Sequence, residues 1–566
     1  MSSNSRKLDE IRAGRSELEN HYIDELVGGR ISRRQFVRKG AVIGMSSSLI
    51  GVILSACGGA NSSSSASSTG SATSAASGTP KQGGTLRLAQ QAPAATINPL
   101  TIADAGGLNM LAQTGEFLVF DNNLLLKLQP MLATSWTPSA SGAVWTFKLR
   151  PNVKFHNGQA MTAKDVVYTF KQLSDPKLAS NALSAFTGVL TPAGVTMVDS
   201  MTVAFHLEAP NGNFPYLVSS DNYNAIIVPD GTDFGKWQST FIGTGPFTLK
   251  SYTQNVGATF LANPNHWAGK PYLDGSAFTF YTSQPPQILA LQGSQVDGIV
   301  QFTAQGAQSL LNSSTYNVIK LKSANHRELS MRNDQAPFTD ARVRQAVALS
   351  FGRPEMITAL LLGAGQLGND SPFGPRFPST DTTVPQRVQD LTKAKQLLTA
   401  AGHPHGFSAP LVTEQYEEIL ALAQVMKADL AKVGITANLK VETQTQYYGK
   451  DTYGNSDWLD STMSLVDYGD RGAPNVYLES PLTSNGTWNA AHFKNKTYDN
   501  LVKQYVAALD LATQKQLAGK IETLLLAETP IVVPYFVDGL TATTQRVHGV
   551  NPTAISAIYL NKAYMS

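Results

Sequence analysis

Alternating hydrophobic and polar positions predict several short strands in the first half of the chain. A Gly pair precedes one such segment at 85–89, and two more lie at 144–150 and 203–207, each closed by a Pro residue shortly afterwards. Between about 240 and 300, Gly and Pro residues interrupt the pattern repeatedly. That region is therefore predicted to consist of short strands and turns.

Helical spacing takes over at positions that carry a capping residue. Thr162 with Asp165 three positions later has the form of a capping box, with Asp in place of Glu. Asp340 can cap a second helix, and a third is predicted from about Thr392 to Ala401, before Gly402.

The second half of the chain alternates helix and strand. Apolar residues at helical spacing predict a helix over about 417–432, and Gly434 follows at its C-terminal end. Residues 435–441 then alternate as a strand. The order helix, Gly, strand favours a mixed α/β fold, and no repeat of fixed period occurs.

The N-terminal segment has the order of parts found in exported lipoproteins. Arg33 and Arg34 lie in a sequence similar to a twin-arginine export signal, and a weakly apolar stretch from 41 to 54 follows, too short for a comfortable membrane span. Cys57, the only cysteine, ends the lipobox-like run Leu54-Ser55-Ala56-Cys57. We expect a lipoprotein signal peptide over 1–57, cleavage before Cys57 and acylation of its thiol. A buried structural cysteine and an uncleaved signal anchor are the alternatives.

A flexible tether and a neutral body follow this signal. Residues 58–82 are rich in Ser, Gly and Ala, which is typical of a linker. Residues 1–56 hold nine of the 44 Lys and Arg residues and six of the 41 Asp and Glu residues, so the rest of the chain carries 35 of each. The basic balance therefore belongs to the targeting segment, and nucleic acid is not an expected partner. With one cysteine, a disulfide within the chain is excluded.

Two motifs with catalytic or cofactor associations are better interpreted as loops. Residues 363–368 match the dinucleotide fingerprint letter for letter, but a helical stretch precedes them where a strand is required. His403-Pro404-His405 follows a Gly and has no nearby third ligand, so no metal is expected. The sequence contains no nucleophile elbow, zinc-protease helix or P-loop, and we expect neither catalytic residues nor a cofactor.

One polar segment stands out chemically. Asp467-Tyr468-Gly469-Asp470-Arg471 follows the apolar piece 463–466, which is predicted to be a buried strand ending in a turn. Loops at strand ends of α/β lobes tend to bind ligands, and an acidic residue there could hold an ammonium group. An ordinary polar turn is the alternative.

Several segments, in this order, resemble bacterial extracellular solute-binding protein family 5, the dipeptide- and oligopeptide-binding class that serves ABC importers. The resemblance covers about 83–545. The matching segments are Gly83-Gly84-Thr85-Leu86, Asn98-Pro99-Leu100, Pro130-Met131-Leu132-Ala133-Thr134-Ser135-Trp136, Trp145-Thr146-Phe147-Lys148-Leu149-Arg150-Pro151-Asn152-Val153-Lys154-Phe155-His156-Asn157-Gly158, Gly243-Thr244-Gly245-Pro246-Phe247, Asn263-Pro264-Asn265-His266-Trp267 and Pro337-Phe338-Thr339-Asp340-Ala341-Arg342.

The resemblance implies an α/β, two-lobed periplasmic-binding-protein-like fold of type II, in its large cluster C form. Lobe I would span 83–329 with an inserted subdomain at about 130–235, lobe II would span 330–534, and 535–566 would return to lobe I. It also implies a non-enzymatic monomer outside the cytoplasmic membrane, lipid-anchored, that captures a peptide or similar polar solute by hinge closure and passes it to ABC permease subunits.

The same resemblance implies a ligand site around Asp467, which occupies the place of an Asp that pairs with the peptide's free amine. Tyr468, Ser464, Asp470 and Trp488 complete the expected ligand-binding set, and Trp458 and Tyr477 are further candidates for its walls. Packing without ligand contact is the alternative for the four aromatic residues. The chain departs from the family pattern at Ser464, where an aromatic residue is usual, and at Asp470-Arg471, where Asp-Pro is usual. These departures leave the ligand open between peptides and an oligosaccharide, a nickel complex or another amine-bearing solute. An exported hydrolase remains a rival interpretation.

Overall fold

The computed structural model describes residues 80–566. The expected export signal with Arg33 and Arg34, the lipidation residue Cys57 and nearly all of the expected tether lie outside the described residues. Within 80–566, no helix combines the length and the apolar character needed to span a bilayer.

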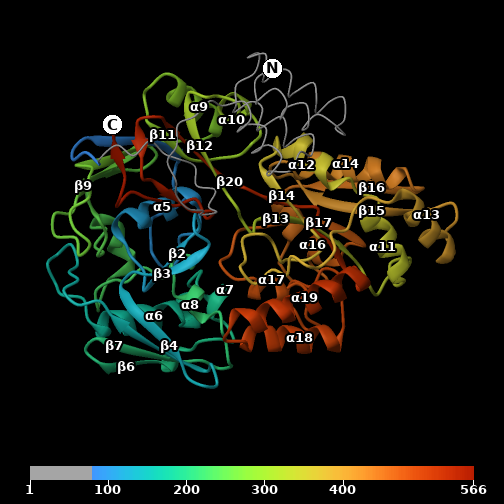
Figure 1. Ribbon diagram of the computed structural model, residues 1–566, viewed down its shortest axis with the longest axis horizontal. Helices are drawn as coiled ribbons and strands as arrows, with labels where there is room; N and C mark the ends of the chain where they lie inside the picture. Colours follow the sequence, from blue (N-terminus) through green and yellow to red (C-terminus); the bar gives the residue numbers. More distant parts are fainter. Residues whose placement is uncertain (1–79) are drawn as a thin grey trace, which may run out of the picture. The chain divides into compact units, whose positions relative to one another are not determined.

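The first large sheet is built from both ends of the described chain. Its central strand β1 runs parallel to β10 and β11, and the outer pairings are antiparallel. In Figure 1 this sheet accordingly combines blue, green and red strands. Leu86 and Leu88 of β1 are fully buried, which confirms the strand predicted there. In spatial order the strands are β12 (Tyr316–Leu321), β20 (Gly539–Thr544), β11 (Gly298–Phe302), β1 (Thr85–Gln91), β10 (Gly275–Tyr281), β9 (Gly257–Ala262) and β8 (Phe247–Thr253).

A four-stranded antiparallel sheet forms the segment inserted after the first strands. Trp145, Phe147 and Leu149 point into its core, as their alternation predicts. Helix α6 (Ala163–Leu173) packs against it and begins with the predicted capping box between Thr162 and Asp165. The strands in spatial order are β4 (Ala133–Pro138), β5 (Val144–Leu149), β7 (Thr202–His206) and β6 (Val195–Asp199).

The second large sheet holds the helix-strand alternation predicted for the second half. Helix α14 (Ile419–Ala431) leads through Gly434 at φ 90° into β16, as expected from the sequence. Strands β15, β16 and β17 are parallel neighbours. The strands are β14 (Gly365–Leu367), β19 (Tyr535–Val537), β13 (His326–Met331), β17 (Met463–Tyr468), β15 (Phe407–Glu414) and β16 (Ile435–Glu442), with β18 (Ile531–Val532) beside β13.

The remaining elements are helices and short hairpins. Two of the helices, α18 and α19, lie side by side (Figure 1). The helices not yet named are α5 (Ala105–Thr114), α7 (Leu183–Phe186), α8 (Phe214–Leu217), α9 (Gln284–Gln292), α10 (Gln308–Leu311), α11 (Ala341–Leu349), α12 (Arg353–Leu361), α13 (Leu391–Ala400), α15 (Gln444–Tyr448), α16 (Asp457–Asp460), α17 (Asn475–Glu479), α18 (Lys496–Ala507) and α19 (Leu511–Glu528). The hairpins are β2 (Val119–Asn122) with β3 (Lys127–Pro130), β21 (Val547–His548) with β24 (Tyr564–Met565), and β22 (Asn551–Pro552) with β23 (Ile558–Tyr559).

Three local predictions are corrected by the structure. The 240–300 region contains helix α9 in addition to strands and turns, and two prolines lie in the first turn of this helix. Prolines are compatible with a first helical turn because its N–H groups have no partner within the helix. Residues 365–367 form the edge strand β14 instead of a loop. Strand β17 continues through Asp467 and Tyr468, so the turn begins at Gly469.

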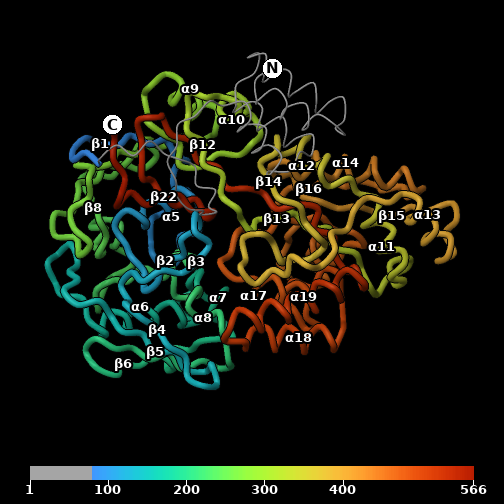
Figure 2. Tube along the Cα trace, in the orientation of Figure 1, coloured from blue at the N-terminus to red at the C-terminus, as the bar shows by residue number. Residues whose placement is uncertain are grey.

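The chain passes twice between the two large sheets. The first crossing lies between Leu321 of β12 and His326 of β13, and the second lies at Asp538, between β19 and β20. Figure 2 follows both crossings along the trace, the first in yellow-green and the second in red. The second sheet therefore starts before residue 330 and ends after residue 534, a shift of a few residues from the expected lobe boundaries. The two crossings are joined by a hydrogen bond of 2.7 Å from Val537 N–H to the Asn325 carbonyl oxygen.

Each large sheet has its own hydrophobic core. Leu88, Phe147 and Phe260 belong to the core of the first sheet and its inserted segment, whereas Leu329 and Leu465 belong to the core of the second sheet. We call the two halves lobe I (80–321 and 539–566) and lobe II (326–537). Separate cores allow two lobes to move relative to each other without breaking either core.

Candidate functional site

A cavity of about 430 Å³ lies between the two lobes. Lobe I supplies the ends of β1 and β11 and the starts of α5 and α9. Lobe II supplies the end of β17 and the segments that follow β15 and β17. The lobe I side includes Gln90, Gln91, Gly106, Leu108, Gln284, Gln301, Thr303 and Ser556, and the lobe II side includes Tyr416, Glu417, Asp467, Gly469, Asp470 and Arg471.

Asp467 lies on the lobe II wall of this cavity. Its strand β17 runs parallel to β15, so the carboxyl ends of the two strands meet at one edge of the sheet. Glu414, the last residue of β15, is fully buried beside it. The Tyr448 hydroxyl donates to Glu414 Oε1 at 2.7 Å and lies 3.5 Å from Asp467 Oδ1.

The same wall contains more carboxylates than cations. Arg327, which has no exposed side-chain surface, donates through Nε to Glu418 at 2.8 Å and through Nη2 to Glu417 at 2.9 Å. We call Arg327, Glu417 and Glu418, with Asp467 and Glu414 beside them, the Arg327 cluster. Four carboxyl groups thus surround one guanidinium group, which gives this wall a negative potential.

Burial raises the pKa of two carboxyl groups on this wall. For Glu414, burial is the largest cause, hydrogen bonds from Tyr448 and Gln444 oppose it, and the charge of Asp467 adds to the rise. For Glu417, burial raises the pKa and Arg327 partly offsets the rise. A cationic group in the cavity would stabilise the ionised forms of both.

The structure brings only part of the predicted site to the cavity. Asp467 and Asp470 line it, whereas Ser464, Tyr468 and Trp488 do not. The cause is the two-residue period of a strand, which puts Ser464 and Tyr468 on the face of β17 opposite Asp467. Those three residues, and the wall candidates Trp458 and Tyr477, are not among the residues that line the cavity. Tyr468 packs on Tyr477 and Trp488, and Trp458 packs on Trp488.

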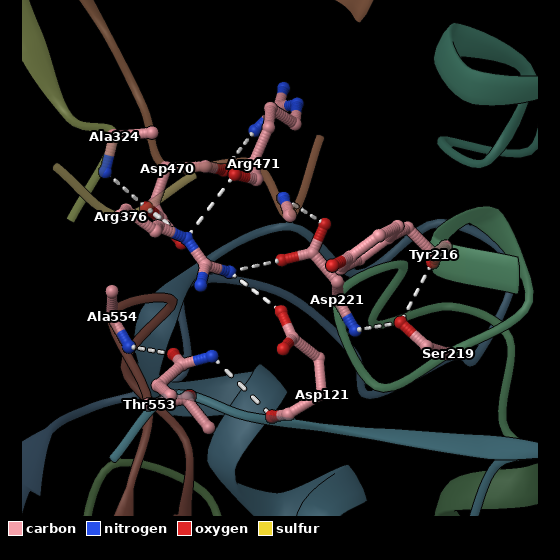
Figure 3. A network of polar contacts seen from close by, with 12 residues as sticks. Asp121, Tyr216, Ser219, Asp221, Ala324, Arg376, Asp470, Arg471, Thr553 and Ala554 are labelled. Atoms are coloured by element: carbon pink, nitrogen blue, oxygen red, sulfur yellow. Dashed lines mark hydrogen bonds and ion pairs between the residues drawn. The ribbon is translucent and has the colours of Figure 1, made fainter. Parts of the chain in front are cut away.

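Asp470 belongs to a second charged cluster, which joins the two lobes (Figure 3). Arg376 of lobe II contacts Asp470 through Nε at 3.0 Å, and its Nη2 donates to Asp121 and to Asp221 of lobe I, both at 2.9 Å. Asp470 also accepts from Ala324 N–H at 2.5 Å, next to the first crossing. We call these four side chains the Arg376 cluster.

The Arg376 cluster holds three carboxyl groups for one guanidinium group, all with less than a tenth of their side-chain surface exposed. Burial raises the pKa of Asp121 to about 6, against the opposing effect of Arg376 and with a further contribution from Asp221. Burial likewise raises the pKa of Asp470 to about 6, with Arg376 opposing it. Contact between the lobes therefore favours proton uptake at this cluster.

Comparison with known proteins identifies the class of this two-lobed architecture. The family described as bacterial extracellular solute-binding proteins, family 5, matches residues 127–489. This chain belongs to that family.

Relatives and solved structures agree with this membership in family 5. The chain is 25% identical over 462 residues to heme-binding protein A of Haemophilus influenzae, covering 76% of this chain and 83% of that protein. It is 24% identical over 492 residues to the dipeptide-binding protein of Escherichia coli, covering 80% of this chain and 89% of that protein.

Solved structures show the fold. HbpA2 from Haemophilus parasuis matches with a TM-score of 0.76 and 21% identity, over 85% of this chain and 100% of that one. The unliganded open form of the murein tripeptide binding protein MppA matches with a TM-score of 0.73 and 22% identity, over 86% of this chain and 98% of that one. The family 5 chain thus has the type II periplasmic-binding-protein fold, and the fold prediction is confirmed.

Sequence reasoning missed most of the charged groups around the cavity of this family 5 protein. Glu414 is the last residue of β15, Glu417 follows it, and the parallel strand β17 ends just after Asp467. The rule that parallel strands end at one edge of a sheet could therefore have found both glutamates. Asp121, Asp221 and Arg376 come from irregular segments, and no local pattern links them.

No candidate metal centre emerges from residues 80–566, where no group of three or more His, Cys, Asp or Glu side chains is arranged to hold an ion. His403 packs against Phe407 at 5.3 Å between ring centroids, at the turn between α13 and β15.

Proposed function

We propose that this protein is the solute-binding component of an ABC importer and captures a peptide or similar amine-bearing solute in the cavity between its lobes. The observation that carries the proposal is the carboxylate-rich lobe II wall with Asp467 at its surface. An ammonium group placed there gains charge-assisted hydrogen bonds and relieves the repulsion among the carboxyl groups. Relatives of this chain include a dipeptide-binding protein and a heme-binding protein, which supports a binding role without turnover.

The proposed mechanism is closure of the two lobes around the solute. Contacts that form only in the closed state, such as those of Arg376 with Asp121 and Asp221, stabilise that state, and the solute adds contacts to both walls. The closed form is then presented to permease subunits. Asp470 contributes to closure through Arg376 and is not proposed to touch the solute directly.

We further propose that the protein acts as a lipid-anchored monomer on the outer side of the cytoplasmic membrane. The lipobox at Cys57, the Arg33-Arg34 signal and the tether support this location. Replacing Cys57 by Ser is expected to release the protein from the membrane fraction of expressing cells, and unchanged membrane association would contradict the anchor.

Asp467→Asn tests the ammonium site while keeping the side-chain shape. Binding of trialanine is expected to weaken by on the order of 10-fold or more, because a hydrogen bond to a charged group contributes about 1.5–3 kcal/mol. Binding of N-acetyl-trialanine, measured by the same calorimetric titration, is expected to stay unchanged. Equal weakening of both peptides would remove Asp467 from the site.

Tyr468→Phe is the matched control, because Tyr468 is the neighbour of Asp467 on the opposite face of β17.

Wild-type protein that binds hemin, a sugar or a nickel chelate but no free-amine peptide would favour a non-peptide ligand. Cleavage of the added peptide would support the rival hydrolase interpretation.

A further inference from the structure

A second cavity, of about 320 Å³, adjoins the first through two shared residues. It lies between residues 181–224 of lobe I and residues 471–480 of lobe II. Tyr223 and Arg471 line both cavities. A solute bound at Asp467 that extends along the first cavity therefore meets Arg471 where the two spaces join.

Arg471 has no carboxylate partner at this join. Its Nη1 donates to the carbonyl oxygen of Asp470 at 2.9 Å, and no ion pair involving Arg471 is found in the described part of the chain. The neighbouring carboxylates Asp470 and Asp221 pair with Arg376 instead. A guanidinium group has five N–H donors, so most of those of Arg471 stay available.

The guanidinium group lies over the turn that begins the cavity wall. Arg471 Nη1 is 3.8 Å from the position that a Cβ atom would take at Gly469, which itself lines the first cavity. Burial lowers the pKa of Arg471, but Tyr477, Tyr223 and Asp221 outweigh this effect and raise it above its usual value. The group is therefore a fixed positive charge beside the acidic wall.

No other Lys or Arg lines either cavity among residues 80–566. The first cavity is thus lined by the carboxyl groups of Asp467, Glu417 and Asp470 and by one guanidinium group, that of Arg471. Asp470 is paired with Arg376, so Asp467 and Arg471 are left as opposite charges at separate points of the same lobe II wall. Opposite charges fixed at two points, without pairing to each other, match a solute that carries both an ammonium group and a carboxylate.

We propose that Arg471 pairs with a carboxylate of the bound solute and makes the protein selective for zwitterionic solutes over their carboxamides. The inference rests on the proposed function and adds to it the group recognised at the second end of the solute. The sequence departs from the usual Asp-Pro of the family at this position, so the recognition belongs to this chain and is not carried over from its relatives.

The rival explanation is that Arg471 only offsets the surplus negative charge of the Arg376 cluster. The two explanations differ in whether binding depends on a carboxylate of the solute. A charge-balancing arginine stabilises the contact between lobes whatever the solute carries, whereas a recognition arginine distinguishes a carboxylate from an amide.

The experiment compares trialanine with its C-terminal amide on the full-length protein, by calorimetric titration. Wild-type protein is expected to bind the free acid on the order of 10-fold or more tightly than the amide, because the charged hydrogen bonds are lost in the amide. Arg471→Met is expected to reduce this ratio to about twofold or less, because the residue that distinguishes acid from amide is lost. Arg471→Lys, which keeps the charge but not the forked geometry, is expected to restore part of the ratio.

Arg342→Met is the matched control, because Arg342 is an exposed arginine paired with Asp340 on lobe II. Its acid-to-amide ratio is expected to equal that of the wild type, and thermal unfolding verifies that each variant is folded. A wild-type protein that binds acid and amide equally, or an Arg471→Met variant that loses both equally, overturns the inference. N-acetyl-trialanine reports on the amine site separately, so loss of carboxylate selection alone leaves the proposed function intact, and absence of any peptide binding overturns both.

Discussion

Arg327 and Arg376 are both buried guanidinium groups surrounded by carboxylates, but their partners come from different parts of the chain. Arg327 contacts Glu417 and Glu418 of its own lobe, and these contacts persist however the lobes move. Arg376 contacts Asp121 and Asp221 of the other lobe, so those contacts exist only while the lobes touch. The first cluster lies at the cavity wall, and the second joins the two lobes. The comparison teaches that a buried ion pair acts on folding or on conformation according to which segments it joins.

Loss of the Arg327 guanidinium is expected to give the largest effect, on folding. Arg327→Met leaves buried carboxylates without their partner, which costs about 3–5 kcal/mol in the free energy of unfolding. Chemical denaturation measures this loss, with Arg342→Met as the control that is expected to show no measurable change. A stability equal to that of the wild type would contradict the assignment of Arg327 to the fold of lobe II.

Loss of the Arg376 guanidinium is expected to act on closure more than on folding. In Arg376→Met, separation of the lobes lets Asp121 and Asp221 regain water, so the cost falls on the closed state. We expect the affinity for trialanine to fall by on the order of 100-fold, with a smaller loss of unfolding free energy than in Arg327→Met. Small-angle scattering is expected to show a larger radius of gyration at saturating peptide. If Arg327→Met and Arg376→Met lose the same peptide affinity and the same free energy of unfolding, the distinction between the two clusters is wrong.

A pH dependence of binding is the smaller, sharper test of the Arg376 cluster. In separated lobes Asp121 loses Arg376 and regains water, so it is expected to have an ordinary carboxyl pKa, whereas in contact its pKa is raised to about 6. The closed state then binds the proton more strongly than the open state. Closure is therefore favoured as the pH falls through 6, and the gain in affinity ends when the pH reaches the ordinary carboxyl pKa. One such group predicts about tenfold tighter binding at pH 5 than at pH 7.5.

Asp121→Asn removes this group and provides the control for the titration of the peptide itself. Its affinity is expected to change less with pH than that of the wild type, measured with the same peptide and buffers. Binding that tightens toward pH 7.5 in the wild type relative to the variant would reverse the predicted sign.

The fold was predictable from local signals wherever a single element carried them. The alternation of Trp145, Phe147 and Leu149 and the Thr162–Asp165 capping box each appear in the structure as expected. The 284–292 helix was not predicted from the sequence, and its paired prolines lie in the first turn, where they are tolerated.

The candidate site was only partly predictable, because its geometry depends on tertiary contacts. Asp467 could be found from a strand end, but strand length decides which neighbours share its face, and β17 proved two residues longer than expected. Arg376 and Asp121 are 255 positions apart in the sequence, and only the contact between the lobes brings them together.

The hydrogen bond that joins Val537 to Asn325 limits how the two halves of this molecule can move. Two connecting strands fastened to each other can flex as a pair, but sliding or twisting one past the other would break the bond between them. Rotation about a single axis keeps this bond, so we expect that kind of motion to be favoured. The side-chain oxygen of Asn325 also accepts from Arg327 Nη1 at 2.8 Å, so a hydrogen bond connects the first crossing to the Arg327 cluster at the cavity wall. A solute is consequently expected to enter and leave the cavity on the side away from the two crossings.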